Sequence, residues 1–92
     1  MSRIKMDDLE KTLRHETDKW LNKMKDEIVH IELLDKKKEY MVDNIKAYIK
    51  DSEIFLKQEK LVMAFEAVLW SWAIFETLRD LKIIKSRKLE RT

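Results

Sequence analysis

The sequence contains no cysteine, no glycine and no proline among its 92 residues. The absence of cysteine excludes disulfides, thiolate metal sites and cysteine nucleophiles, and it favours a reducing compartment such as the cytoplasm. Sheets rich in tight hairpins and phosphate-cradling loops rely on glycine, which alone adopts positive φ angles at little cost. Helices joined by short polar connections need neither glycine nor proline, so the composition favours an all-α fold.

An excess of charge of one sign is also missing. Twenty Lys and Arg residues face 18 Asp and Glu residues, and the net charge of +2 gives no overall field that would attract nucleic acid. Hydrophobic residues make up 45% of the chain, enough to fold residues 1–92 as one domain. We find no signal-like apolar stretch near the N-terminus and no run of about 20 uncharged residues. The sequence therefore predicts a cytoplasmic protein without a membrane partner, and its many Lys and Glu residues fit a thermophile's surface.

Apolar residues recur at helical spacing in three segments, which predict helices at about 7–34, 36–57 and 61–84. Asp35 is a suitable N-cap between the first two helices, and Gln58, Glu59 and Lys60 interrupt the apolar pattern between the second and third. Because short connections make consecutive helices antiparallel, we expect a three-helix up-down-up antiparallel bundle with short loops.

The third predicted helix differs from the other two. Between Leu61 and Phe75 it has one charged residue, Glu66, and its apolar positions cover more than the face that a bundle can bury. We expect Trp72 in the core, together with Leu61, Phe65, Val68 and Leu69. Trp70 lies about 200° from Trp72 around the helix, so it points to an outer side, which carries Val62, Met63, Ala73 and Thr77. Either the first helix covers this side, or it is an interface.

Six short motifs between residues 48 and 84 resemble an archaeal family known as domain of unknown function 357: Tyr48-Ile49-Lys50-Asp51, Phe55-Leu56, Gln58-Glu59-Lys60, Ala64-Phe65-Glu66, Trp72-Ala73 and Phe75-Glu76. The resemblance implies a short helical bundle and brings no activity with it. We expect its motif positions to be structural: Tyr48, Asp51, Phe55, Ala64, Trp72 and Glu76. For Asp51 we expect a bond across the turn between the last two helices.

The sequence departs from the pattern of this family at four positions. The family has Gly where Glu59 and Lys82 stand, Tyr in place of Trp72, and Asp in place of Glu76. A residue other than glycine in the left-handed conformation costs only about 1 kcal/mol, so these departures affect the turns more than the fold.

Glu27 and His30 form a Glu-x-x-His unit, which ferritin-like bundles use in pairs to hold two metal ions. The second copy is missing, because Thr12 stands three residues before His15, the other histidine. We therefore predict no metal and no cofactor.

Glu66 and Glu76 occur in the most apolar segment, where burial would raise a carboxyl pKa. They are separated by about 15 Å of helical rise and cannot form a carboxylate pair by themselves. We predict no catalytic residue and no enzyme. The enzymatic alternative requires Asp51, Glu66, Glu76 or His30 to meet in one cleft.

Basic residues gather near the C-terminus, where the helix macrodipole alone would favour them: Lys82, Lys85, Arg87, Lys88 and Arg91. A nucleic-acid-binding module that uses this segment is the second hypothesis, although accessible aromatics are missing among these charges. The leading hypothesis is a non-catalytic interaction or structural module that self-associates as a homo-oligomer through its third helix. An unknown protein partner is a further alternative.

Overall fold

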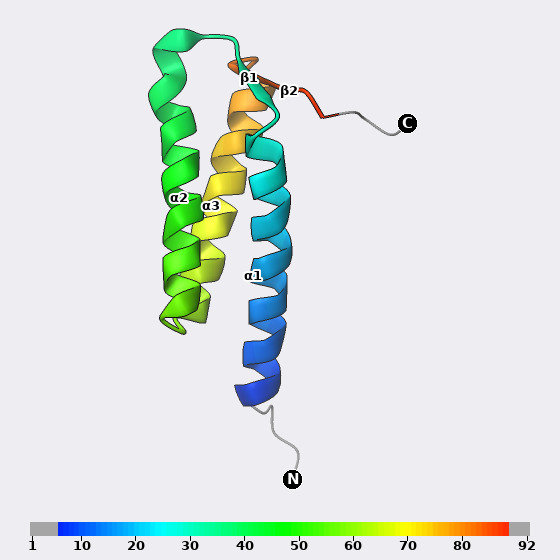
Figure 1. Ribbon diagram of the computed structural model, residues 1–92, viewed down its shortest axis with the longest axis vertical. Helices are drawn as coiled ribbons and strands as arrows, with labels where there is room; N and C mark the ends of the chain where they lie inside the picture. The colour runs from blue at the N-terminus through cyan, green and yellow to red at the C-terminus, as the bar shows by residue number, and fades with distance from the viewer. Residues whose placement is uncertain (1–5, 89–92) are drawn as a thin grey trace.

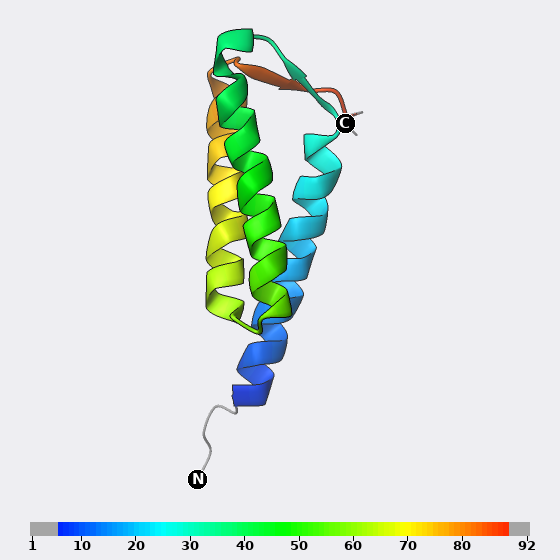
Figure 2. The same ribbon diagram turned by 60° about the vertical axis from the view of Figure 1, so that its left-hand side comes forward.

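The computed structural model describes residues 6–88 and confirms an all-α bundle with three helices. α1 spans Met6–Ile28, α2 spans Glu39–Lys57 and α3 spans Leu61–Asp80. They run up, down and up, and α3 packs against both other helices (Figure 1). Figure 2 shows α2 and α3 side by side along most of their length, with α1 crossing them.

The first and third helices end earlier than predicted, at Ile28 and Asp80 instead of Leu34 and Ile84. The residues beyond them form two short antiparallel strands, β1 (Ile31–Leu33) and β2 (Ile84–Ser86). Glu32 lies opposite Lys85 in this pair. A strand of three residues is too short for its alternation of apolar and polar side chains to be distinguished from a helical pattern. The pairing also joins segments far apart in the sequence, so no local pattern predicts it.

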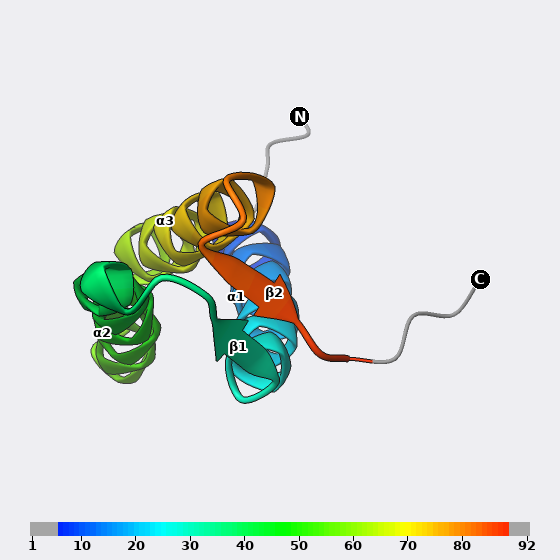
Figure 3. The same ribbon diagram turned by 90° about the horizontal axis from the view of Figure 1, so that it is seen from above.

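The β1–β2 pair crosses the end of the bundle above α1 and α3, as the view from above shows (Figure 3). Two further backbone bonds extend the ladder: Leu34 N–H donates to the Ile83 carbonyl at 2.8 Å, and Arg87 N–H donates to the His30 carbonyl at 2.7 Å. Between β1 and α2, Asp35 caps a 3-10 turn, η1 (Lys36–Lys38), by accepting from Lys37 N–H at 3.1 Å. Asp35 is therefore confirmed as a cap, but it caps η1, and α2 begins at Glu39 instead of the predicted start at about residue 36.

The core lies where the three helices and β2 meet. It consists of buried aliphatic and aromatic side chains: Leu21, Met24, Val42, Ile45, Ile49, Val68, Phe75, Leu78 and Ile84. Three buried hydroxyl residues satisfy their donors on backbone carbonyls. Thr17 and Ser71 each donate to a carbonyl of their own helix, α1 and α3 respectively. Ser52 of α2 donates to the Ala64 carbonyl of α3 at 2.8 Å and so joins the two helices.

α2 and α3 are each followed, two residues after their last residue, by a left-handed residue that is not glycine. Glu59 has φ 61° and Lys82 has φ 63°. In each turn two N–H groups bond back to the last carbonyls of the helix, which is the Schellman pattern of C-terminal capping. The turn geometry that glycine usually provides is thus retained at both positions where the family pattern has glycine.

By length and composition alone, α3 is long and apolar enough to cross a membrane. Core helices of folded bundles meet the same criteria. One side of α3 is buried in the core here through Val68, Phe75 and Leu78.

Candidate interaction surface

One side of α3 stays uncovered by the rest of the described chain. Trp70 is 59% exposed and Val62 is 63% exposed, so α1 does not cover this side. The uncovered residues recur at intervals of three, four and seven, which places them along one helix face. We call this surface the outer face of α3, and it consists of Val62, Met63, Glu66, Leu69, Trp70, Ala73 and Thr77.

The outer face is centred on Trp70. The Trp70 ring stacks on Tyr48 of α2, with ring centroids 6.4 Å apart and planes inclined by 22°. Glu66, Leu69 and Ala73 line a shallow apolar depression together with the indole. Because Tyr48 supports one ring face, Trp70 is held in place while much of its surface remains exposed.

Leu69 corrects the sequence-based assignment, which placed it in the core. It is 43% exposed and belongs to the outer face. Leu69 lies three residues after Glu66 and four before Ala73, and residues at these intervals share a helix face. This spacing could have assigned Leu69 to the outer face. Leu61 and Val68 are buried as expected, while Phe65 is half-buried.

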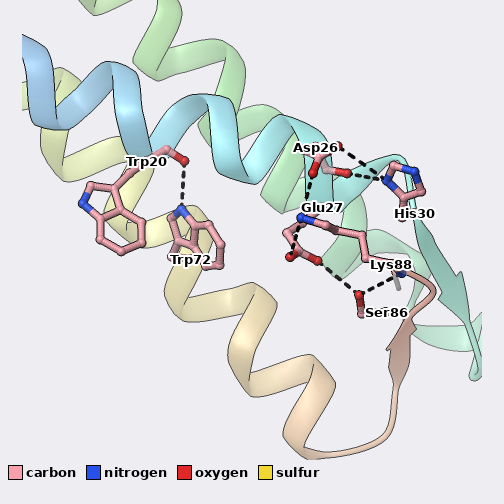
Figure 4. Close-up of polar contacts among 7 residues, drawn as sticks. All are labelled: Trp20, Asp26, Glu27, His30, Trp72, Ser86 and Lys88. Atoms are coloured by element: carbon pink, nitrogen blue, oxygen red, sulfur yellow. Dashed lines mark hydrogen bonds and ion pairs between the residues drawn. The ribbon is translucent and has the colours of Figure 1, made fainter. Parts of the chain in front are cut away.

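Trp72 points the opposite way, against α1. Its indole N–H donates to the Trp20 carbonyl at 3.0 Å, and the two rings meet edge to face with centroids 5.6 Å apart (Figure 4). Phe75 continues the cluster with a second edge-to-face contact at 5.6 Å. These contacts fix α1 on α3, so Trp72 is the inner aromatic and Trp70 the outer one.

The other family-motif positions lie at the α2–α3 connection or on the surface. Ala64 is buried and its carbonyl accepts from Ser52, while Phe55 is half-buried and its carbonyl accepts from Lys60 N–H. Asp51 and Glu76 are exposed. The side-chain bond that joins the last two helices therefore comes from Ser52, not from Asp51 as predicted.

The four groups that an enzymatic site would require are spread over the molecule. Of these groups, Glu66 alone lines the depression beside Trp70. Asp51 is exposed on α2, and the His30 ring lies beyond the end of α1, with Nδ1 2.7 Å from the Asp26 carbonyl oxygen. Within residues 6–88, no three His, Asp or Glu side chains are grouped to hold a metal ion.

Glu27 and Asp26 instead hold β2 against the end of α1 (Figure 4). Ser86 Oγ donates to Glu27 Oε1 at 3.2 Å, and Lys88 Nζ contacts Asp26 Oδ2 at 2.7 Å and Glu27 Oε2 at 3.5 Å. The hydrogen bond from Lys88 holds the pKa of Asp26 below its ordinary value, and that bond also raises the pKa of Lys88.

The basic residues near the C-terminus differ in whether they form ion pairs with acidic residues. Arg87 pairs with Glu32 at 3.1 Å and Lys88 with Asp26, so both are engaged in holding the strands. Lys82 and Lys85 line a pocket with Arg79, and Lys85 also lies beside Arg87 and Lys88. Arg91 lies outside the described residues.

Comparison with known proteins gives a family and a fold. No curated protein matches the sequence. The crystal structure of protein AF1782 from Archaeoglobus fulgidus, which is assigned to the DUF357 family, is similar with a TM-score of 0.77 and 40% sequence identity. The match covers 85% of this chain and 97% of AF1782. A family model described as "Protein of unknown function (DUF357)" matches residues 17–84. The chain belongs to the DUF357 family.

Proposed function

We propose that this chain is a non-catalytic interaction module that forms a homodimer through the outer face of α3. The observation that carries the proposal is the exposed Trp70 at the centre of that face. Tryptophan dominates binding energy at protein interfaces when neighbouring residues exclude water from it. Val62, Met63 and Leu69 are exposed on the same face and supply apolar neighbours for Trp70.

The sizes of the side chains on the outer face favour a second copy as the partner. In an antiparallel pair with a two-fold axis between residues 71 and 72, Trp70 of each copy lies opposite Ala73 of the other. The depression beside Trp70, which Ala73 helps to form, would then receive the partner's indole. Each copy thus offers both the large side chain, Trp70, and the depression beside Ala73 that can receive it.

Charge favours the antiparallel arrangement over the parallel one. A parallel pair in register would place the two copies of Glu66 opposite each other. Like charges facing each other across an interface are unfavourable. The antiparallel pair places Glu66 opposite Thr77 and so separates the two Glu66 carboxylates.

The interface is one helix wide, so we expect an area below the roughly 800 Å² per partner of standard interfaces. Its dissociation constant should then fall in the micromolar range. Sedimentation equilibrium over a wide range of protein concentration measures it. Trp70→Ala should weaken the dimer by about tenfold or more, because it removes the central anchor. Tyr40→Ala, which removes an exposed aromatic of α2, is the matched control and should leave the constant unchanged.

Ala73→Glu tests the pairing itself. It fills the depression and adds a charge without removing Trp70, so the dimer should be lost while circular dichroism and thermal unfolding of the monomer are retained. A wild-type chain that stays monomeric at millimolar concentration overturns the proposal, and so does equal weakening by Trp70→Ala and Tyr40→Ala.

A further inference from the structure

The segment that holds η1 and the C-terminal end of α3 lie at the same end of the bundle (Figure 1), and both carry cations. They come from segments far apart in the sequence, which the bond from Leu34 N–H to the Ile83 carbonyl holds together. Asp35, Glu39 and Asp80 are the acidic residues of segments 34–40 and 79–86, and Glu32, which lies opposite Lys85 in the strand pair, forms its ion pair with Arg87. No salt bridge within residues 6–88 involves any of the six cations. These cations are Lys36, Lys37 and Lys38 of η1, Arg79, Lys82 and Lys85.

Three of these cations surround a pocket. Arg79, Lys82 and Lys85 line a cavity of about 440 Å³, and Leu34, Ile84 and Ser86 complete the lining. This volume lies in the range of pockets that hold small organic ligands. Leu34, which is 48% exposed, provides an apolar wall in front of the buried Ile84, while the guanidinium of Arg79 lies 5.3 Å from the centre of the Phe75 ring. The pocket therefore combines apolar wall atoms with cationic groups.

The backbone conformation of Lys82 is energetically unfavourable for a residue other than glycine. Its φ of 63° lies in the left-handed region, where glycine is favoured by about 1 kcal/mol over a residue with a Cβ. A residue kept in an unfavourable conformation is a reason to look for a function of its side chain. Here the side chain supplies a cation to the pocket.

We infer that this end of the bundle binds the phosphate backbone of a single-stranded nucleic acid. A phosphodiester group occupies the pocket between Arg79, Lys82 and Lys85, and its sugar contacts the apolar wall. The lysines of η1 bind neighbouring phosphates. Six cations spread over several segments exceed what one phosphate requires and fit a chain of phosphates instead. Arg87 and Lys88, which the sequence-based hypothesis included, contribute to holding the strands.

The test measures binding of a fluorescein-labelled single-stranded RNA dodecamer by fluorescence anisotropy, from low to physiological salt. With about three to six phosphate contacts, log K should fall with log salt at a slope of roughly −2 to −4. Lys82→Gly should weaken binding several-fold and reduce the magnitude of the slope by about 0.7. The same substitution relieves the left-handed backbone, so it should also raise thermal stability. Loss of binding cannot then be ascribed to unfolding.

Two controls are matched to Lys82→Gly. Glu59→Gly makes the same backbone change in the other Schellman turn, at the far end of the bundle, and should not weaken binding. Lys57→Gln removes one exposed cation at that far end and should leave the slope unchanged. Inorganic phosphate should displace the RNA more strongly than chloride at equal ionic strength. Trp70→Ala should bind as the wild type does, because the outer face of α3 is a separate surface.

Three results overturn the inference. One is undetectable RNA binding at the lowest salt. Another is equal weakening by Lys57→Gln and Lys82→Gly, which would show a response to net charge alone. The third is tighter binding to vesicles of anionic phospholipid than to RNA, which would assign the surface to a membrane.

Discussion

At the scale of single residues, the two left-handed positions show how the chain forms glycine-type turns without glycine. Glu59 and Lys82 both receive the bonding pattern of a Schellman cap, so the capping bonds outweigh a local cost of about 1 kcal/mol each. The two residues differ in what their side chains gain. Glu59 accepts an ion pair from Arg14 at 2.6 Å, while Lys82 lines the cationic pocket.

We predict that Lys82→Gly raises the free energy of unfolding by about 1 kcal/mol, because the left-handed strain disappears and no ion pair within the described residues is lost. Glu59→Gly should gain less, since it also removes the exposed pair with Arg14, which contributes up to about 1 kcal/mol. Urea denaturation of the two variants and the wild type measures both values. A destabilised Lys82→Gly would contradict the assignment of strain to this residue.

At the scale of elements, the helices could be predicted from the sequence and the strands could not. The long apolar stripes of α1, α2 and α3 repeat over several turns, so their existence followed from periodicity. β1 and β2 depend on pairing between residues far apart in the chain, such as Leu33 and Ile84, and no local pattern carries that information. For the same reason the division of the basic segment between Lys82 and Lys88 could not be predicted.

The outer face of α3 was partly predictable for a related reason. Helical geometry alone separates Trp70 from Trp72, so the sequence placed Trp70, Met63 and Ala73 on one side. Whether α1 reaches that side depends on where α1 packs, which its own sequence does not specify. Leu69 was misplaced because it lies near the boundary between the two faces.

The anchoring of β2 to α1 makes a prediction about pH. Because Lys88 lowers the pKa of Asp26 in the folded chain, this pair contributes stability that is present above the unfolded pKa of Asp26, near 3.8. That contribution is lost as the pH falls through the lower, folded pKa. In Lys88→Gln the pKa of Asp26 should rise towards 3.8, measured by NMR titration of the carboxyl carbon. Lys85→Gln is the control, and an Asp26 pKa that stays low in Lys88→Gln would contradict the assignment.

At the scale of the whole molecule, self-association and stability are linked. A dimer that forms only between folded chains stabilises them by mass action. The thermal midpoint of the wild type should therefore rise with protein concentration, whereas that of Trp70→Ala should rise less over the same range. Differential scanning calorimetry at several concentrations measures this dependence, and a constant midpoint for the wild type would contradict dimerisation.

The β1–β2 pair also determines how the molecule would respond to mechanical force. α1 leads into β1 next to Ile31, and the chain leaves β2 after Ser86, the residue paired with Ile31. A load applied through α1 and the C-terminal segment would first reach the contacts of Lys88 with Asp26 and the bond from Arg87 N–H to the His30 carbonyl. It would then open the ladder one hydrogen bond at a time. The α2–α3 hairpin lies outside that path until the ladder has opened. The small sheet would therefore open before the helices of the hairpin carry the load.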